Sequence, residues 1–324
     1  MGHAPILLTS ADCQRLLSPL DVIAQIERVL SWDAAGLIHW PTPRSLNIAP
    51  DRWGNDYHVK ICVLEPVPVA GIRLVSHPLD ESSPSCTRLI VLIDPTTTLP
   101  IALVDESWNY MHRTVASIAM AAKKLANPDA RRLAIIGAGR LARTSADYYA
   151  RLFDLNEIRV ASRTASRRDA LVTDLRDQLG VEVRGFESVQ EAVRDADLVL
   201  TATSATTALL EEPWIAPGTV VASVGTTEPG RDLLEKADLF VVDSREQLRK
   251  ELIAEFGEGS PEWIDATVIE IVSGQHPGRT DASQRVVIVT EGMASQDIAL
   301  AHLAYERALK HGVGQVVPLA AAAP

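Results

Sequence analysis

The sequence predicts an α/β protein built from a doubly wound parallel sheet and a second, α+β domain. The chain has 324 residues, of which 47% are hydrophobic, so it is long enough to fill two cores of ordinary size. Residues 133–136 are four consecutive apolar residues, as in a strand buried on both faces, and glycines lead from them into a helical pattern. Beyond this point short apolar runs alternate with helical segments, which is the order of a parallel sheet with helical crossovers.

The turn after residues 133–136 is typical of a Rossmann-type dinucleotide site. Gly137 permits the tight turn, Gly139 lets the backbone approach a pyrophosphate, and Ala142 is small where helix and strand pack closely. The start of the helix offers N–H groups and a partial positive charge to phosphates. We therefore expect the whole turn to bind the cofactor: Gly137, Ala138, Gly139, Arg140, Leu141 and Ala142. An ordinary strand-to-helix turn is the alternative.

The first part of the chain is predicted to form its own sheet. Residues 6–8 are expected to be a short strand, and Thr9 or Ser10 to cap one helix that ends at Gly36. The segment that follows has a residue pattern typical of β-structure, and strands are expected at residues 57–64, 69–76, 88–94 and 101–104. A helix over 108–125 is expected to end at Asn127-Pro128.

The second part alternates strands and helices. Strands are expected at residues 158–161, 198–201, 220–224, 239–242 and 286–289, with helices at 166–179 and 294–311. We assign residues 127–294 to the dinucleotide-binding domain. Residues 1–126 form the other domain, to which the last helix returns in 295–324.

Composition favours a small-molecule partner. The net charge of -11 opposes binding to nucleic acid or to an anionic membrane, because both are negatively charged and attract proteins with an excess of Lys and Arg. The cysteines Cys13, Cys62 and Cys86 are odd in number and lack metal-binding spacing, so we expect neither a disulfide framework nor a metal site. No apolar run reaches the length of a membrane span and no signal segment is visible, so we expect a cytoplasmic protein.

The residues after the second expected strand favour NADP(H) over NAD(H). An NAD site usually carries an acidic residue there to bind the ribose hydroxyls, and this chain has none. The residues present offer donors and positive charge suited to a 2′-phosphate: Ser162, Arg163, Thr164 and Arg167. The alternative is a solvated helix start, with NAD(H) as the cofactor. Thr203 and Val224 are further candidates for cofactor binding.

Three further stretches resemble the ornithine cyclodeaminase/mu-crystallin family. They are residues 111–126, which contain Arg113-Thr114, residues 196–204, and residues 291–297, Glu-Gly-Met-Ala-Ser-Gln-Asp. The resemblance covers nearly the whole chain in order. It implies a homodimer whose first domain supplies the pairing sheet and the substrate pocket, and chemistry by hydride transfer at the Cα–N bond of an amino acid.

The activities of the resembling family diverge, and local sequence gives two hints that disagree. The stretch Gln275–Asp281 looks most like the branch that cleaves an N-substituted glutamate oxidatively to make diaminopropionate. The loop at Arg163 looks more like mu-crystallin, a ketimine reductase that uses NADPH. Ornithine cyclodeamination and amino-acid oxidation are the other activities of the family.

The resemblance also implies which residues bind the substrate. Arg113 matches the arginine that clamps the α-carboxylate, a task suited to a planar, permanently charged group, and Arg44 matches a second carboxylate-binding arginine. Arg73 stands where cyclodeaminases carry a lysine, so we expect it to bind substrate and not to act as a base. Lys60 and His77 complete the candidates, although an edge-strand lysine and a structural histidine are the alternatives.

The loop after residue 224 departs from the family pattern. Thr227 stands where cyclodeaminases place an aspartate that contacts the substrate amine, and Glu228 is a possible substitute. Without that anion, ring closure of ornithine is disfavoured. Arg73, Thr227, Glu228 and Asp297, the last in the turn near the nicotinamide, are thus the catalytic candidates. The adjacent Asp105 and Glu106 have no glycosidase-like spacing and are set aside.

The sequence therefore predicts an NAD(P)H-dependent oxidoreductase for the CH–NH or C=N bond of an amino or imino acid. If Arg44, Lys60, Arg73 and Arg113 share one cavity, their repulsion favours a substrate with more than one negative group, a dicarboxylate or an N-carboxyalkyl amino acid. The alternatives are the oxidative synthase of the diaminopropionate type, an ornithine cyclodeaminase, and a crystallin-like protein that binds NADP without catalysis.

Overall fold

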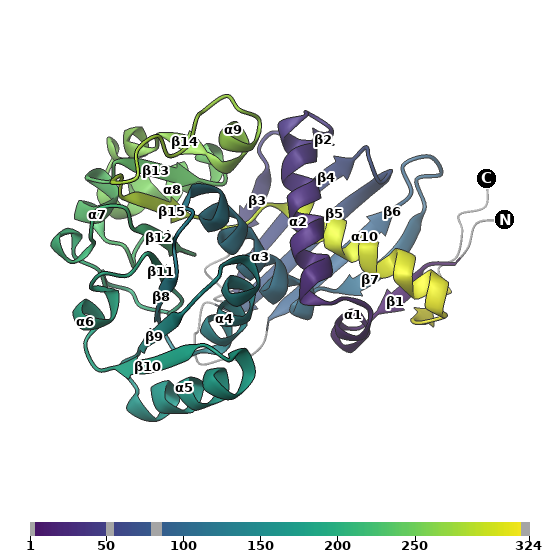
Figure 1. Ribbon diagram of the computed structural model, residues 1–324. Helices are drawn as coiled ribbons and strands as arrows, with labels where there is room; N and C mark the ends of the chain where they lie inside the picture. The colour runs from purple at the N-terminus through teal and green to yellow at the C-terminus, as the bar shows by residue number, and fades with distance from the viewer. Residues whose placement is uncertain (1–3, 50–54, 79–85, 319–324) are drawn as a thin grey trace. The chain divides into compact units, whose positions relative to one another are not determined.

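The computed structural model describes residues 4–49, 55–78 and 86–318 (Figure 1). The chain forms two compact units. Unit 1 comprises the residues up to Arg113 together with those from Met293 onward, and unit 2 is Thr114–Gly292. The division falls inside helix α3 (Ser107–Leu125), earlier in the chain than the boundary expected after residue 126.

Unit 2 is built on an eight-stranded sheet in which every neighbouring pair of strands is parallel (Figure 1). From edge to edge the strands are β10 (Glu182–Phe186), β9 (Glu157–Ala161), β8 (Arg132–Ile136), β11 (Leu198–Thr201), β12 (Val220–Ser223), β15 (Val286–Val289), β13 (Leu239–Val242) and β14 (Ala266–Thr267). The chain extends from β8 to β10 on one side and then returns to β11 on the other. This reversal is the switch point at which doubly wound sheets bind ligands, so the expected fold is confirmed.

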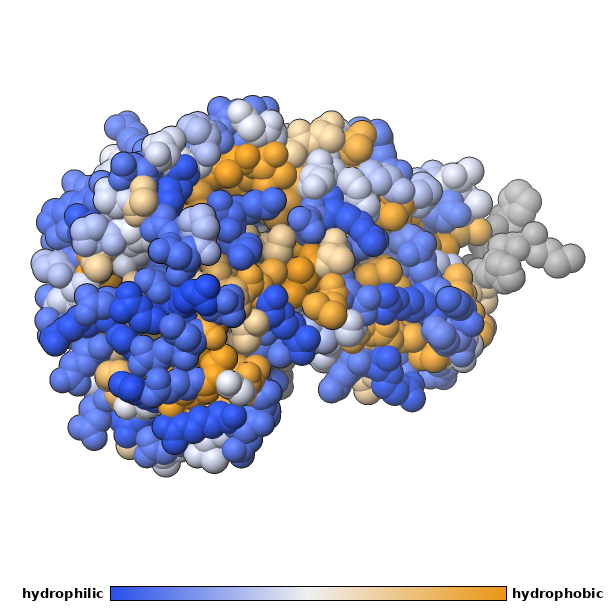
Figure 2. Space-filling view, in the orientation of Figure 1, coloured by the Kyte–Doolittle hydropathy of each residue, from blue (hydrophilic) through white to orange (hydrophobic). Residues whose placement is uncertain are grey.

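Helices connect the strands of unit 2. They are α4 (Arg140–Leu152), α5 (Ala165–Leu179), α6 (Val189–Val193), α7 (Arg231–Glu235), α8 (Arg245–Phe256) and α9 (Val268–Val272), with short 3₁₀ turns at Glu212–Trp214 and Ser260–Trp263. Strands β11, β12, β13 and β15 are buried at every position, as helical cover on both faces requires. On the face seen in Figure 2 the surface of this unit is largely hydrophilic, in keeping with the chain's net charge of -11.

Unit 1 contains a mixed sheet. Its strands are ordered β16 (Gln315–Val316), β1 (Ile6–Leu8), β7 (Pro100–Asp105), β6 (Thr87–Ile93), β5 (Val69–Pro78), β4 (Asn55–Leu64) and β2 (Ile38–His39), and β3 (Ser45–Ile48) also pairs with β4. Strand β1 runs parallel to β7, whereas the other pairs are antiparallel. The hairpin strands expected from the sequence are present, and β2 and β3 were not predicted.

One face of this sheet is covered by helix α10 (Ala294–His311), against which α2 (Pro19–Ala34) packs (Figure 1). Gly71 permits the close approach of α10 to β5, because a Cβ atom at this position would lie 2.5 Å from Cγ1 of Ile298. The opposite face of the sheet leaves apolar side chains accessible, notably Leu46 and Ile48 at 59% and 64% exposure.

The single N-terminal helix that we expected is wrong. The structure has two helices, α1 (Ser10–Leu16) and α2, separated at Leu17 and Ser18. Ser18 caps α2 with a reciprocal capping box to Asp21, and Pro19 occupies the first turn, so a second helix start interrupts the apolar periodicity. The expected cap at Thr9 is confirmed, since its side chain accepts from the backbone N–H of Asp12.

Among the described residues, none of the helices is both long and apolar enough to cross a bilayer. Within the same residues, no group of three or more histidine, cysteine or carboxylate side chains is arranged to hold a metal ion.

Candidate functional site

The glycine turn of unit 2 lies between β8 and α4, at the switch point of the sheet. Gly137 has φ +125°, and a Cβ atom there would lie 2.3 Å from the carbonyl oxygen of Ala202, so only glycine fits. Its N–H donates to the carbonyl of Ala161 at 2.8 Å. The turn is thereby held against the carboxyl ends of both neighbouring strands.

The surroundings of this turn fit a bound dinucleotide. Gly139 caps α4 with extended backbone and no capping side chain, and a Cβ atom there would meet nothing within 4 Å. The backbone beside the first turn of α4 is therefore open to a phosphate group, whereas Ala142 is fully buried where helix and sheet pack. Arg140 is exposed at the helix start, with Ala138 and Leu141 half-buried beside it.

The carboxyl end of β9 presents the residues expected to distinguish the two dinucleotides. Arg163 and Arg167 are exposed, and Thr164 caps α5 without a side-chain hydrogen bond to the helix. The hydroxyl of Ser162 accepts from the N–H of Thr164 at 3.4 Å. Positive charge and a helix start thus coincide at this strand end, where no carboxylate is present.

Glu228 ties together the carboxyl ends of β11 and β12. One carboxylate oxygen accepts from the N–H and the hydroxyl of Thr203 at 2.9 and 2.5 Å, and the other from the hydroxyls of Thr201 and Ser223 at 3.0 and 3.3 Å. The side chain is buried, with 5% exposure. These four donors hold the carboxylate that we expect as a possible substitute for the family aspartate. Thr227 is half-buried in the same loop, as is Val224 at its start.

Unit 1 contains a buried network of alternating charges. Arg73 binds Glu106 through two contacts, Nη2 to Oε1 at 2.6 Å and Nε to Oε2 at 2.9 Å. The same Nε lies 3.3 Å from Oδ2 of Asp297, whose Oδ1 accepts from Nε of Arg113 at 2.5 Å. None of the four side chains is more than 6% exposed. We call these residues, Arg73, Glu106, Asp297 and Arg113, the charge network.

Tyr110 gathers guanidinium groups beside this network. Its ring centroid lies 4.8 Å from Cζ of Arg113, 5.5 Å from Cζ of Arg73 and 4.2 Å from Cζ of Arg88. Contacts of this kind favour a cation by about 0.5 to 2 kcal/mol each, depending on how far it is desolvated. Arg88 was not among the residues expected from the sequence, because strand position alone does not show what a side chain faces.

Glu106, for which we expected no glycosidase-like role, belongs to the charge network. It precedes α3 and has no accessible surface, and its partner Arg73 is on β5. Burial and the negative charge of Asp297 raise the pKa of Glu106 to about 7, although Arg73 opposes the shift. The position of Glu106 next to Asp105 in the sequence does not indicate its pairing with Arg73. That pairing depends on the direction in which the chain leaves the sheet to enter α3.

The remaining substrate-binding candidates lie on the same sheet or next to it. Lys60 is paired directly with Arg73 across β4 and β5, so both side chains point to the face covered by α10. Arg44 lies just before β3, with Cζ 4.6 Å from the ring of Trp40. His77 is in β5, but its side chain lies outside the described residues.

The charge network changes the balance of charges that we expected for the substrate pocket. We expected four cations whose repulsion would demand several negative groups on the substrate. Two of them, Arg73 and Arg113, are instead compensated by Glu106 and Asp297 within the protein. Repulsion among these cations therefore no longer argues for a dicarboxylate substrate.

Comparison with known proteins matches the ornithine cyclodeaminase/mu-crystallin family model to residues 65–312 of the chain. The chain belongs to this family. One relative, the Δ1-pyrroline-2-carboxylate reductase of Bacillus cereus, is 29% identical over 96% of this chain and 99% of its own. The ketimine reductase mu-crystallin of Rattus norvegicus is 32% identical over 70% and 71% of the two chains.

Two further members of the ornithine cyclodeaminase/mu-crystallin family extend the comparison. The N-((2S)-2-amino-2-carboxyethyl)-L-glutamate dehydrogenase of Staphylococcus aureus is 28% identical over 78% of each chain. The Δ1-pyrroline-2-carboxylate reductase of Thermococcus litoralis, solved with NADH and L-proline, superimposes with a TM-score of 0.88 at 29% identity, covering 96% of this chain and all of that one. The relatives are thus imine reductases and amino-acid dehydrogenases.

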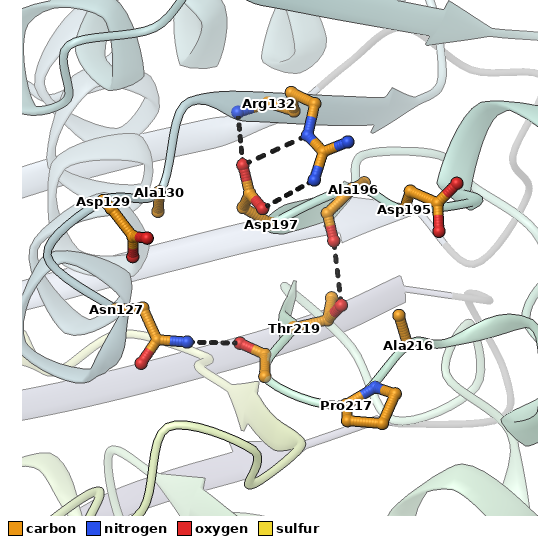
Figure 3. A pocket seen from close by; sticks show the side chains of 11 residues that line it. Asn127, Asp129, Ala130, Arg132, Asp195, Ala196, Asp197, Ala216, Pro217 and Thr219 are labelled. Atoms are coloured by element: carbon orange, nitrogen blue, oxygen red, sulfur yellow. Dashed lines mark hydrogen bonds and ion pairs between the residues drawn. The ribbon is translucent and has the colours of Figure 1, made fainter.

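A small pocket of about 200 Å³ lies at the opposite end of the unit 2 sheet from the glycine turn (Figure 3). It is lined by segments that precede β8, β11 and β12. Its polar groups bind one another: Arg132 pairs with Asp197 at 3.2 Å, and Thr219 donates to the carbonyl of Ala196 at 2.8 Å. Because doubly wound parallel sheets bind ligands at the carboxyl ends of their strands, we assign these contacts to loop packing.

The raised pKa of Glu106 gives a testable pH dependence of stability. The folded protein holds this proton up to about pH 7, whereas the ordinary value is 4.5, so the stabilising contribution is complete below pH 4.5 and is lost as the pH rises through 7. In urea unfolding between pH 5 and 8, the wild type should lose stability relative to Glu106→Gln. Glu187→Gln, at an exposed position, is the control. Parallel curves for wild type and Glu106→Gln would contradict the assignment.

Proposed function

We propose that the protein is a nicotinamide-dependent oxidoreductase that reduces the C=N bond of an imino acid, or oxidises the corresponding amino acid. The observation that carries this proposal is the buried pair of arginines, Arg73 and Arg113, held by Asp297 in a family whose members named above act on such substrates. The glycine turn of unit 2 fits the cofactor. When bound, the nicotinamide exchanges a hydride with the substrate carbon.

The role of Arg113 is to bind the substrate carboxylate. Its guanidinium is permanently charged and desolvated, conditions under which a bidentate contact to a carboxylate is strongest. Asp297 accepts from its Nε, which fixes the plane of the guanidinium before substrate arrives. Arg73 contacts the same aspartate from the other side, so the two arginines share one positioning anion.

Thr227 and Glu228 argue against ornithine cyclodeamination. The family resemblance places the amine-binding aspartate of cyclodeaminases at Thr227, a neutral residue. The carboxylate of Glu228 binds Thr201, Thr203 and Ser223 instead. A cationic amine on the substrate side chain would therefore lack its anion, whereas the imine of a cyclic imino acid has no such requirement.

The proposal predicts oxidation of reduced cofactor, followed as the loss of nicotinamide absorbance, with cyclic imines that carry a carboxylate, such as Δ1-pyrroline-2-carboxylate. Arg113→Gln should lower kcat/KM by about 100-fold, the effect of losing two charge-assisted hydrogen bonds. The double variant Arg113→Gln/Asp297→Asn also removes the negative charge that Arg113 balances, and controls for the effect of that imbalance on folding. Absence of turnover on every imino and amino acid, or full activity of Arg113→Gln, would overturn the proposal.

We further propose NADP(H) as the preferred cofactor. The argument rests on the exposed Arg163 and Arg167 and on the uncapped start of α5, because a 2′-phosphate gains charge-assisted bonds there. The Thermococcus litoralis relative was solved with NADH, so NAD(H) is the alternative cofactor.

Arg163→Ala tests the cofactor preference. It should lower kcat/KM for NADPH by about 10-fold or more, the value of one charge-assisted hydrogen bond, and leave the value for NADH unchanged. Arg163→Lys, which keeps the charge, should retain part of the preference. A wild-type enzyme that favours NADH would refute the proposal directly.

The open face of the unit 1 sheet supports a homodimer. Ile61, Ile72, Val91 and Leu103 form one row across β4, β5, β6 and β7, and Ile61 is 38% exposed. Contiguous apolar surface of this kind on a sheet marks an interface. A second copy of the chain fits it, since the family resemblance implies pairing through this sheet.

Light scattering in solution tests the dimer. The wild type should have twice the chain mass of 35.1 kDa. Ile61→Asp should give monomers, because it buries a charge in the interface. Leu20→Asp, at another exposed apolar position, is the matched control and should stay dimeric. A wild-type monomer would contradict this proposal.

A diaminopropionate-type dehydrogenase is the second candidate, favoured by the Staphylococcus aureus relative and by the stretch Gln275–Asp281. The structure explains Arg279 in this stretch without a substrate. Its guanidinium donates to the carbonyls of Leu125, Gly218 and Gln284, at 2.6, 3.0 and 2.6 Å. The stretch therefore supports the candidate less than the sequence suggested, and N-substituted glutamates belong in the same assay.

A further inference from the structure

Three arginines, Arg73, Arg88 and Arg113, lie around the ring of Tyr110, and Arg88 is the unusual one. Across residues 4–49, 55–78 and 86–318, the structure shows no hydrogen bond or ion pair for its guanidinium, and its Nε is buried without a partner. Its Cζ lies 4.2 Å from the centroid of the Tyr110 ring. Arg88 is half-buried, and a partly desolvated guanidinium without an anion is unfavourable, so a ligand that supplies an anion is favoured here.

The backbone holds Arg88 firmly next to the charge network. Arg88 pairs with Val75 across β5 and β6, and Arg73 pairs with Ile90, so Arg88 is the diagonal neighbour of Arg73 on the same face of the sheet. Its carbonyl accepts from the N–H of Glu106 at 3.1 Å. Both the sheet and the start of α3 therefore position this arginine.

Within the described residues, three guanidinium groups and two carboxylates lie at or next to the ring of Tyr110. Arg73, Arg88 and Arg113 contact its ring, and two carboxylates, those of Glu106 and Asp297, pair with Arg73 and Arg113. The excess positive charge at Arg88 differs from the repulsion between Arg73 and Arg113, which Glu106 and Asp297 compensate.

We propose that Arg88 binds a second acidic group of the substrate, so that the protein acts on imino or amino dicarboxylic acids. Arg113 takes the carboxylate next to the reacting carbon, and Arg88 takes the carboxylate at the far end of the substrate. The proposal rests on the proposed function for the first of these contacts. It names the substrate class that the function leaves open.

The test compares a dicarboxylate with a monocarboxylate in two ways. Reductive amination by ammonia is measured with 2-oxoglutarate and with 2-oxobutyrate, and binding of the same two acids to the protein without turnover is measured by calorimetry. Arg88→Gln should lower kcat/KM and affinity for 2-oxoglutarate by about 10- to 100-fold and leave those for 2-oxobutyrate unchanged. Arg88→Lys should retain part of the preference, and Arg15→Gln, at an exposed position of α1, should change neither kcat/KM nor affinity for either acid.

The outcomes separate this inference from the proposed function. Turnover with no preference for the dicarboxylate, or equal losses for both acids in Arg88→Gln, would refute the role of Arg88 and leave the function standing. Selective binding of 2-oxoglutarate through Arg88 with no turnover of any imine would support the role of Arg88 and refute the function.

Discussion

The charge network of unit 1 imposes the strictest geometric requirement in the molecule. Each ionised group removed from water costs several kcal/mol unless an opposite charge lies at hydrogen-bond distance. Strand β5, the start of α3 and the first turn of α10 must therefore meet within about 3 Å, the length of a hydrogen bond. Gly71 serves this requirement, since a side chain there would push Ile298 and α10 away from the sheet. The start of α10 also places Asp297 where the helix dipole favours an anion.

A buried ion network is weak evidence for stability, because apolar side chains of similar volume often stabilise a core at least as well. We propose that the network is present because it binds a ligand. Two arginines held by shared carboxylates have their orientation fixed in advance, which reduces the entropy lost when a substrate carboxylate binds. Glu228 in unit 2 is a contrasting case: a buried carboxylate with four neutral donors, suited to holding strand ends in place and not to moving a proton.

The parts of the fold set by local pattern were predictable from the sequence. The apolar run of β8, the glycine turn and the strands β11, β13 and β15 carry their signal within a few residues. Strand β10 was missed because only Val183 of its five residues is buried, so the edge strand has no apolar run. The break between α1 and α2 was overlooked because apolar spacing continues across Ser18 and Pro19.

The candidate site was predictable where a motif assigns one residue a single role. It was not predictable where two residues far apart in the sequence form a pair. Arg113 and Asp297 were identified through motifs, but their mutual contact bridges 184 positions in the sequence. Glu106 and Arg88 carry no local signal, since only the register of β5 with β6 and the exit of α3 bring them to Arg73. We overestimated the excess positive charge of the substrate site because the sequence does not show these pairings with carboxylates.

The central claim is that the charge network of unit 1 is the substrate site. The most direct measurement is a crystal structure of the protein with NADP⁺ and an amino acid product such as L-proline. The account predicts the product carboxylate at about 3 Å from the guanidinium of Arg113, with Asp297 still bound to its Nε. A carboxylate bound away from Arg113, with the network closed and undisturbed, would contradict it.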